Sequence, residues 1–197
     1  MGKTRLARDV GRVEAWRAYR AMSEPLVRRL AADSRWRTVV RMAPDGAGWR
    51  GARSEPQGRG DLGQRLERAI RAHGRAPVAV VGTDAPDLTA DHVRRAFRAV
   101  RTSGAVFGPA SDGGFWLLAL GPREARRVSF PGVRWSTGDA LADARAAIGG
   151  RAALLATLAD VDDGEALRAW RRRLKRGGGV QARVDRPGAA GDGVQRG

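Results

Sequence analysis

The sequence predicts an α/β fold in which helices cover both faces of a sheet, and three observations in its central part support this prediction. The first is an apolar run rich in β-branched residues at 77–82, which is typical of a strand buried on both faces inside a parallel sheet. The second is an amphipathic helix at 89–102, which Thr89 is placed to cap. The third is a pair of further strands at 105–108 and 115–120.

The rest of the chain continues this alternation of helices and strands. The remaining elements are expected as a helix at 13–32, a strand at 38–43, a loop at 44–60, a helix that begins after Asp61, a helix at 138–148, a strand at 153–158 and a helix at 164–174. The aromatic side chains of the first helix, Trp16 and Tyr19, are expected in the core. Residues 1–174 should form one domain, and the apolar-poor stretch 175–197 is expected to be a disordered tail.

Length and composition limit what kind of protein this is. A chain of 197 residues that is 42% apolar can fill one sizeable core. No apolar run approaches the roughly 18 residues of a membrane span. The amino terminus lacks the pattern of a secretion signal, so we expect a cytoplasmic protein. Because the chain has no cysteine, disulfides, thiolate metal sites and cysteine nucleophiles are excluded.

The net charge of +16 raises the question of a nucleic-acid partner. The basic residues are almost all arginine and are scattered through every expected helix, which is typical of a compositional bias. No nucleic-acid-binding motif is visible. We therefore expect no specific nucleic-acid partner, only some non-specific adhesion to polyanions.

Carboxylates follow two of the expected strands directly. Asp84 and Asp87 come after the run 77–82, and Asp112 comes after 105–108. In open α/β sheets, ligands bind beyond the carboxyl ends of the strands, where carboxylates suit a hard cation such as Mg²⁺. The alternative is that Asp84 and Asp87 only form turns or cap the next helix.

Two segments, VGTDAPDL at 81–88 and FGPASDGGFW at 107–116, resemble a bacterial family of GT-A-like nucleotide-diphospho-sugar transferases. Further matching segments lie, in order, at 2–7, 57–66, 132–137 and 157–163. Members are often described as glycosyltransferases, some linked to arsenosugar biosynthesis. The family looks related to molybdopterin-cofactor and phospholactate nucleotidyltransferases. The resemblance implies a three-layer α/β/α sandwich, the Rossmann-like GT-A fold.

In that family, a first β-strand and a glycine loop precede the segment that matches 2–7. The sequence begins within this loop, so the fold is expected to lack the first β-strand. A start codon placed too late, a truncation and a true loss of the strand would all account for this. The expected consequence is an open groove in the sheet or an unusually exposed strand at 78–81. Lys3 and Arg5 would hold nucleotide phosphates, although both also fit solvated charges at a frayed terminus.

Other site residues follow from the resemblance. Gln57 and Gly58 are candidates for contacts with the nucleotide base, because glycine lets the main chain approach it and Gln offers both a donor and an acceptor; a plain loop is the alternative. Trp135 would stack on a sugar or close the site, and Ser136 and Thr137 would bind a phosphate at the next helix. A buried Trp135 with Ser136 or Thr137 as helix cap is equally compatible with the sequence.

The metal site is expected to hold Mg²⁺ or Mn²⁺. The resemblance implies that Asp84 binds it with help from Asp160 or Asp162, whereas the alternative is that Asp162 caps the last helix. Because each of these residues and Asp112 follows an expected strand, the four carboxylates should gather around one cleft.

These residues predict a metal-dependent glycosyltransferase that uses a nucleotide-sugar donor. The acceptor, a small molecule, would lie near Asp112, Gly113 and Gly114, with Asp112 as general base. One alternative is a nucleotidyltransferase that joins a nucleoside triphosphate to a phosphorylated acceptor. A catalytically inactive nucleotide-binding protein is another.

Overall fold

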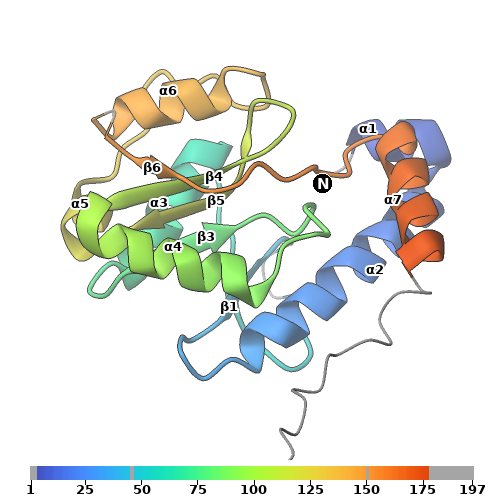
Figure 1. The fold of residues 1–197 in the computed structure, drawn as a ribbon, viewed down its shortest axis with the longest axis horizontal. Helices are drawn as coiled ribbons and strands as arrows, with labels where there is room; N and C mark the ends of the chain where they lie inside the picture. The colour runs from blue at the N-terminus through green and yellow to red at the C-terminus, as the bar shows by residue number, and fades with distance from the viewer. Residues whose placement is uncertain (1–3, 45–46, 150, 178–197) are drawn as a thin grey trace, which may run out of the picture.

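The structure is a computed structural model, and it describes residues 4–44, 47–149 and 151–177 (Figure 1). Lys3 and the stretch 178–197 of the expected tail lie outside these residues. The elements are α1 (Thr4–Val10), α2 (Arg12–Ala31), β1 (Val39–Met42), β2 (Arg53–Pro56), α3 (Leu62–His73), β3 (Val78–Val81), α4 (Ala90–Ser103), β4 (Ala105–Pro109), β5 (Phe115–Leu120), α5 (Pro122–Arg127), α6 (Ala140–Ala147), β6 (Ala153–Leu154) and α7 (Gly164–Gly177).

The described strands form a four-stranded sheet in the order β3-β5-β4-β6 and a separate parallel pair, β1-β2. β5 runs antiparallel to both β3 and β4, and β4 runs parallel to β6. The expectation that β3 lies inside a parallel sheet is therefore wrong. The reason is the short loop 110–114, which sends β5 straight back along β4 and into the place beside β3.

β3 is partly buried, so it is less buried than β4 without being the unusually exposed strand that the sequence predicts. All four of its residues are apolar, yet each is only partly buried, whereas every residue of β4 is buried. Among the described strands, β3 pairs with β5 alone, and β1 pairs with β2 alone. The first described strand of the chain, β1, follows the two helices α1 and α2.

Helices cover both faces of the four-stranded sheet, which gives the three expected layers (Figure 1). Side chains alternate along β4, so that Val106 packs with α4 residues such as Val100 on one face. Phe107 points to the other face and packs with Ile70 of α3 and Ala125 of α5. A third cluster joins α1, α2 and α7, away from the sheet. Of the described helices, none combines the length and apolar character needed to cross a membrane.

Several local expectations are confirmed and others are wrong. Asp61 caps α3 by accepting a hydrogen bond from the Gln64 amide at 2.8 Å. The expected loop 44–60 contains the short strand β2, which completes a pair with β1. Trp16 is 59% exposed, not part of the core. The face of α2 that packs against α1 and α7 carries smaller residues, and the Trp16 ring stacks on Tyr19 outside it, with centroids 5.7 Å apart.

We expect Gly108→Ala to lower the free energy of unfolding by about 1–3 kcal/mol. A Cβ atom at Gly108 would overlap the indole ring of Trp116, which is buried between the sheet and α4 and donates a hydrogen bond to the Ala156 carbonyl. Urea denaturation of both proteins measures the difference. The control is Gly48→Ala, since a Cβ there meets no atom within 4 Å. An equal loss in the two variants would contradict the packing argument.

Candidate functional site

Three carboxylates meet at the end of the sheet where β4 stops. The segment that leads from β6 to α7 passes the same place. Asp112 lies in the loop between β4 and β5, and Asp160 and Asp162 lie between β6 and α7. Each offers one oxygen, and these oxygens lie within 4.8 Å of one another. The cluster joins residues almost fifty positions apart, and the same three side chains form a possible set of ligands for a metal ion.

Main-chain hydrogen bonds hold the two loops together. The Ser111 amide donates to the Leu158 carbonyl at 3.1 Å, and the Ser111 hydroxyl donates to Asp160 Oδ1 at 3.3 Å. Asp112 Oδ1 accepts from the Gly114 amide at 2.8 Å, which folds the loop into a tight turn. A shift in register at Gly108 and Pro109 bends β4 just before this loop. The cluster therefore rests on defined backbone contacts.

Partial burial and, after it, mutual repulsion determine the electrostatics of the cluster. Partial burial, together with the like charges of Asp112 and Asp162, raises the pKa of Asp160 to about 6. Placing a cation among the three carboxylates would relieve this repulsion. The chemistry of the donor set thus fits a hard divalent cation, which binds through oxygen atoms.

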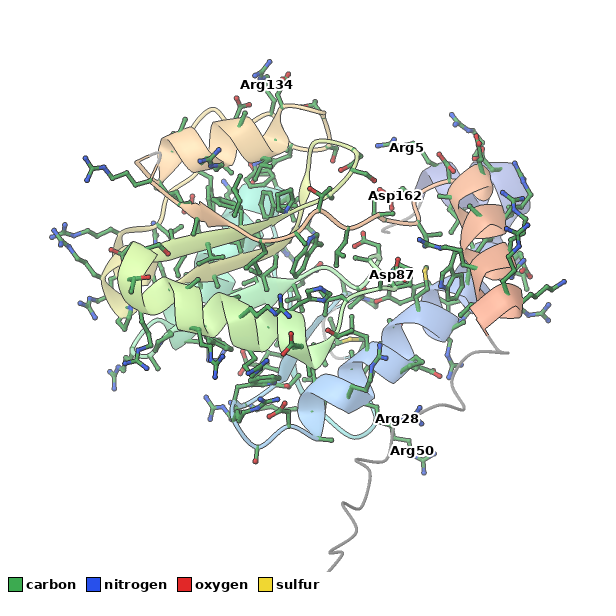
Figure 2. All side chains as sticks on the ribbon, viewed as in Figure 1. Arg5, Arg28, Arg50, Asp87, Arg134 and Asp162 are labelled. Carbon is green, nitrogen blue, oxygen red and sulfur yellow. The ribbon has the colours of Figure 1, made fainter. Side chains whose placement is uncertain are left out.

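Asp84 and Asp87 lie in the loop after β3, beside the cluster. The Asp84 carbonyl accepts from the Val161 amide at 2.9 Å, which joins this loop to the segment that carries Asp160 and Asp162. The Asp84 carboxylate lies over Gly82, where an added Cβ would be 2.6 Å from Oδ1, and it is not one of the three clustered groups. Asp87 forms an ion pair with Arg173 of α7 at 3.1 Å, and Figure 2 shows Asp87 and Asp162 between the sheet and α7.

The residues expected to bind the nucleotide lie in two places. Arg5 is exposed on α1. Gln57 precedes α3, where its side-chain oxygen accepts from Arg65 at 2.9 Å. Gly58 has a φ of +76°, which favours glycine, and a Cβ there would press against the Arg68 guanidinium at 3.1 Å.

The loop between β4 and β5, which contains Gly113, contacts the loop before α6. A Cβ at Gly113 would overlap the main chain of Gly138, and the Gly113 carbonyl accepts from Leu141 of α6 at 3.0 Å. Gly113 also has a φ of +85°. The close approach therefore needs glycine, and it brings Gly113 near the segment that contains Ser136 and Thr137.

Side-chain contacts of the loop before α6 support the buried alternative for Trp135, whereas the residue at the cap position of α6 is Asp139, and its side chain makes no capping hydrogen bond. Trp135 is partly buried and packs edge-on against Phe115 and Phe130, with ring centroids 6.2 and 5.5 Å apart. The Thr137 hydroxyl accepts from the Asp139 amide at 3.3 Å at the start of α6. Ser136 is exposed and has a φ of +61°. A contact of these residues with substrate stays a prediction.

Sequence reasoning did not single out Ser111, which binds Asp160. A signal was present, since Ser111 directly precedes Asp112 in the same short loop. Only the meeting of this loop with the segment after β6 gives the hydroxyl its partner.

We expect Asp160→Asn to raise the Tm of the metal-free protein at about pH 7, because the amide removes a partly buried charge that the neighbouring carboxylates also repel. The pKa of Asp160 in the folded protein is about 6, above its ordinary 3.8, so the folded state binds more protons between these values. Its penalty is absent below about pH 4 and complete above about pH 6, and the Tm difference between variant and parent should grow across this range.

Thermal unfolding in a chelator, at a series of pH values, measures this difference. Asp139→Asn removes one charge from an exposed carboxylate that pairs with Arg134, so it should give no such gain. A lower Tm for Asp160→Asn than for the parent at about pH 7 would show that the charge of Asp160 does not destabilise the folded protein.

Comparison with known proteins identifies the family. Among solved structures, the fold is similar to a protein from Desulfovibrio desulfuricans G20 described as a "putative nucleotide-diphospho-sugar transferase". The two share 24% sequence identity and a TM-score of 0.73, with 88% of this chain and 81% of the other covered. This likeness confirms the predicted fold class. No curated protein sequence matches. Residues 21–137, more than half of the chain, match the family described as "Uncharacterized protein conserved in bacteria (DUF2064)", and the chain belongs to this family.

Proposed function

We propose that this protein is a metal-dependent glycosyltransferase, which moves a sugar from a nucleotide-sugar donor to a small-molecule acceptor. One observation carries the proposal: Asp112, Asp160 and Asp162 come within 4.8 Å of one another beside the ends of strands. Ligands of open α/β sheets bind at this edge. The likeness of the fold to a nucleotide-diphospho-sugar transferase supports the choice of donor.

Asp160 and Asp162 are the proposed ligands of Mg²⁺ or Mn²⁺, with Asp112 beside them in the same cluster. Mg²⁺ is usually held by one or two carboxylates and completed by water and substrate phosphates, which matches a half-exposed cluster. When bound, the cation would neutralise the donor diphosphate and stabilise it as a leaving group. Asp84 remains a candidate for a further ligand, because its carbonyl holds Val161 between Asp160 and Asp162.

The proposed reaction joins an acceptor hydroxyl oxygen to the anomeric carbon of the donor sugar. The bond from that carbon to the diphosphate breaks, and the nucleoside diphosphate leaves with the electron pair. The acceptor hydroxyl loses its proton. We assign the acceptance of this proton to Asp112, the exposed member of the cluster, with the acceptor against the main chain of Gly113 and Gly114.

The remaining residues are proposed to bind the donor. The loop that carries Gln57 and Gly58 would receive the base, since Gly58 already holds a conformation that favours glycine. Lys3 and Arg5 would contact the phosphates, because both side chains offer the positive charge that phosphates need.

The test is a panel of nucleotide sugars and nucleoside triphosphates, each with and without Mg²⁺ or Mn²⁺, read by thermal unfolding. A ligand at 100 times its Kd adds about 2.7 kcal/mol to stability. For a protein of this size that is a rise in Tm of roughly 5–10 °C. We expect a nucleotide sugar to give this rise only when the metal is present, and Asp162→Asn to lose most of it.

The matched control is Asp87→Asn, which removes the same charge from a neighbouring loop but from no clustered carboxylate. It should keep the metal-dependent rise. The released product then separates the enzyme classes, since glycosyl transfer liberates a nucleoside diphosphate and nucleotidyl transfer liberates pyrophosphate. Stabilisation by nucleotide sugars that is equal with and without metal, in parent and Asp162→Asn alike, would overturn the proposal.

A further inference from the structure

A groove of about 300 Å³ lies between α7 and the segment that leads to it. One wall contains Ala159 and Asp160, and the other contains the α7 residues Ala166 and Ala169. These three alanines give the groove a mainly apolar floor of small side chains. Because Asp160 lines the groove and also belongs to the carboxylate cluster, the two features are continuous.

Three arginines of α7 line the same groove, namely Arg172, Arg173 and Arg176. Arg173 is paired with Asp87 at 3.1 Å across to the loop after β3. Arg172 and Arg176 have no acidic partner among residues 4–44, 47–149 and 151–177. Their positions differ by four, which puts the two charges on one face of the helix, and like charges at this spacing destabilise a helix.

No acidic residue lies three or four positions from Arg172 along α7. The residues four positions before and after Arg172 are Arg168 and Arg176, and the residues three positions away are Ala169 and Lys175. The neighbouring Arg171, by contrast, pairs with Glu14 of α2. The positive charge in the groove is therefore uncompensated on its own helix, and an anion bound between the guanidinium groups would stabilise it.

We infer that this groove binds a phosphate group of the acceptor. The inference rests on the proposed function and names the class of its second substrate, a small phosphorylated molecule. Its body would lie on the alanine floor, and its hydroxyl would reach past Asp160 to Asp112 and the adjoining glycine loop. Arginine guanidinium groups match phosphate oxygens with paired hydrogen bonds. The donor base is proposed at the loop before α3, which packs on the sheet face opposite α4, whereas α7 packs with α1 and α2.

The experiment measures binding of inorganic phosphate by calorimetry in EDTA, so that no metal takes part. Arg172→Gln with Arg176→Gln should weaken binding by at least about tenfold, because two charge-assisted contacts are lost. Both side chains are exposed and glutamine favours helices, and circular dichroism checks the fold. Arg172→Lys with Arg176→Lys keeps the charge and should lie between the parent and the glutamine variant.

The control, Arg98→Gln with Arg126→Gln, removes the same charge from exposed arginines of α4 and α5 that do not line the groove. It should bind phosphate as the parent does. Equal weakening in both pairs would mean non-specific attraction to a basic protein, and would overturn the inference. So would displacement of phosphate by a nucleoside diphosphate in the same EDTA buffer, since the groove would then hold the donor.

This measurement is independent of the proposed transferase activity. Phosphate binding that depends on Arg172 and Arg176 supports the groove even if no nucleotide sugar binds with metal. If a nucleotide sugar binds with metal but phosphate does not bind in EDTA, the transferase proposal stands and the inference of a phosphate site in the groove is overturned.

Discussion

The position of β5 is the constraint on which the rest of the structure depends. β5 pairs with β3 on one side and with β4 on the other, and every residue from Trp116 to Leu120 is buried. Its return along β4 is possible only through the tight loop 110–114, which is also the loop that presents Asp112. The same backbone geometry that closes the core therefore fixes one corner of the candidate site, and a change in this loop would affect both.

The strands and helices that the sequence predicts best are those whose signals are local. The apolar run of β3, the cap of α4 at Thr89 and the cap of α3 at Asp61 can each be recognised within a few residues. β2 was missed because Arg53–Pro56 carries no apolar alternation, and it is a strand only because β1 offers it a partner. The prediction that β3 lies inside a parallel sheet is wrong for a related reason, since strand pairing depends on how distant segments meet.

The candidate site divides in the same way. That Asp112, Asp160 and Asp162 follow strands could be read from the sequence, and the edge of the sheet brings them together as that placement suggests. Their mutual distances, the hydroxyl of Ser111 on Asp160 and the burial that raises the Asp160 pKa arise only from tertiary contacts. The arginines of α7 gave no usable signal, because arginine is abundant throughout the chain and only the groove distinguishes Arg172 and Arg176 from the others.

The position of β3 at an edge of the described sheet makes the self-association of this protein depend on its concentration and on salt. Among the described strands β3 pairs on one side only, and an edge strand is a place where an extended chain can pair through main-chain hydrogen bonds. Two copies that approach edge to edge each carry a net charge of +16, and their repulsion opposes the contact. Added salt shortens the reach of that repulsion, to about 8 Å at physiological ionic strength, without weakening main-chain pairing in the same degree. Solutions of this protein should therefore self-associate more readily as salt rises, the reverse of what basic proteins bound to polyanions do.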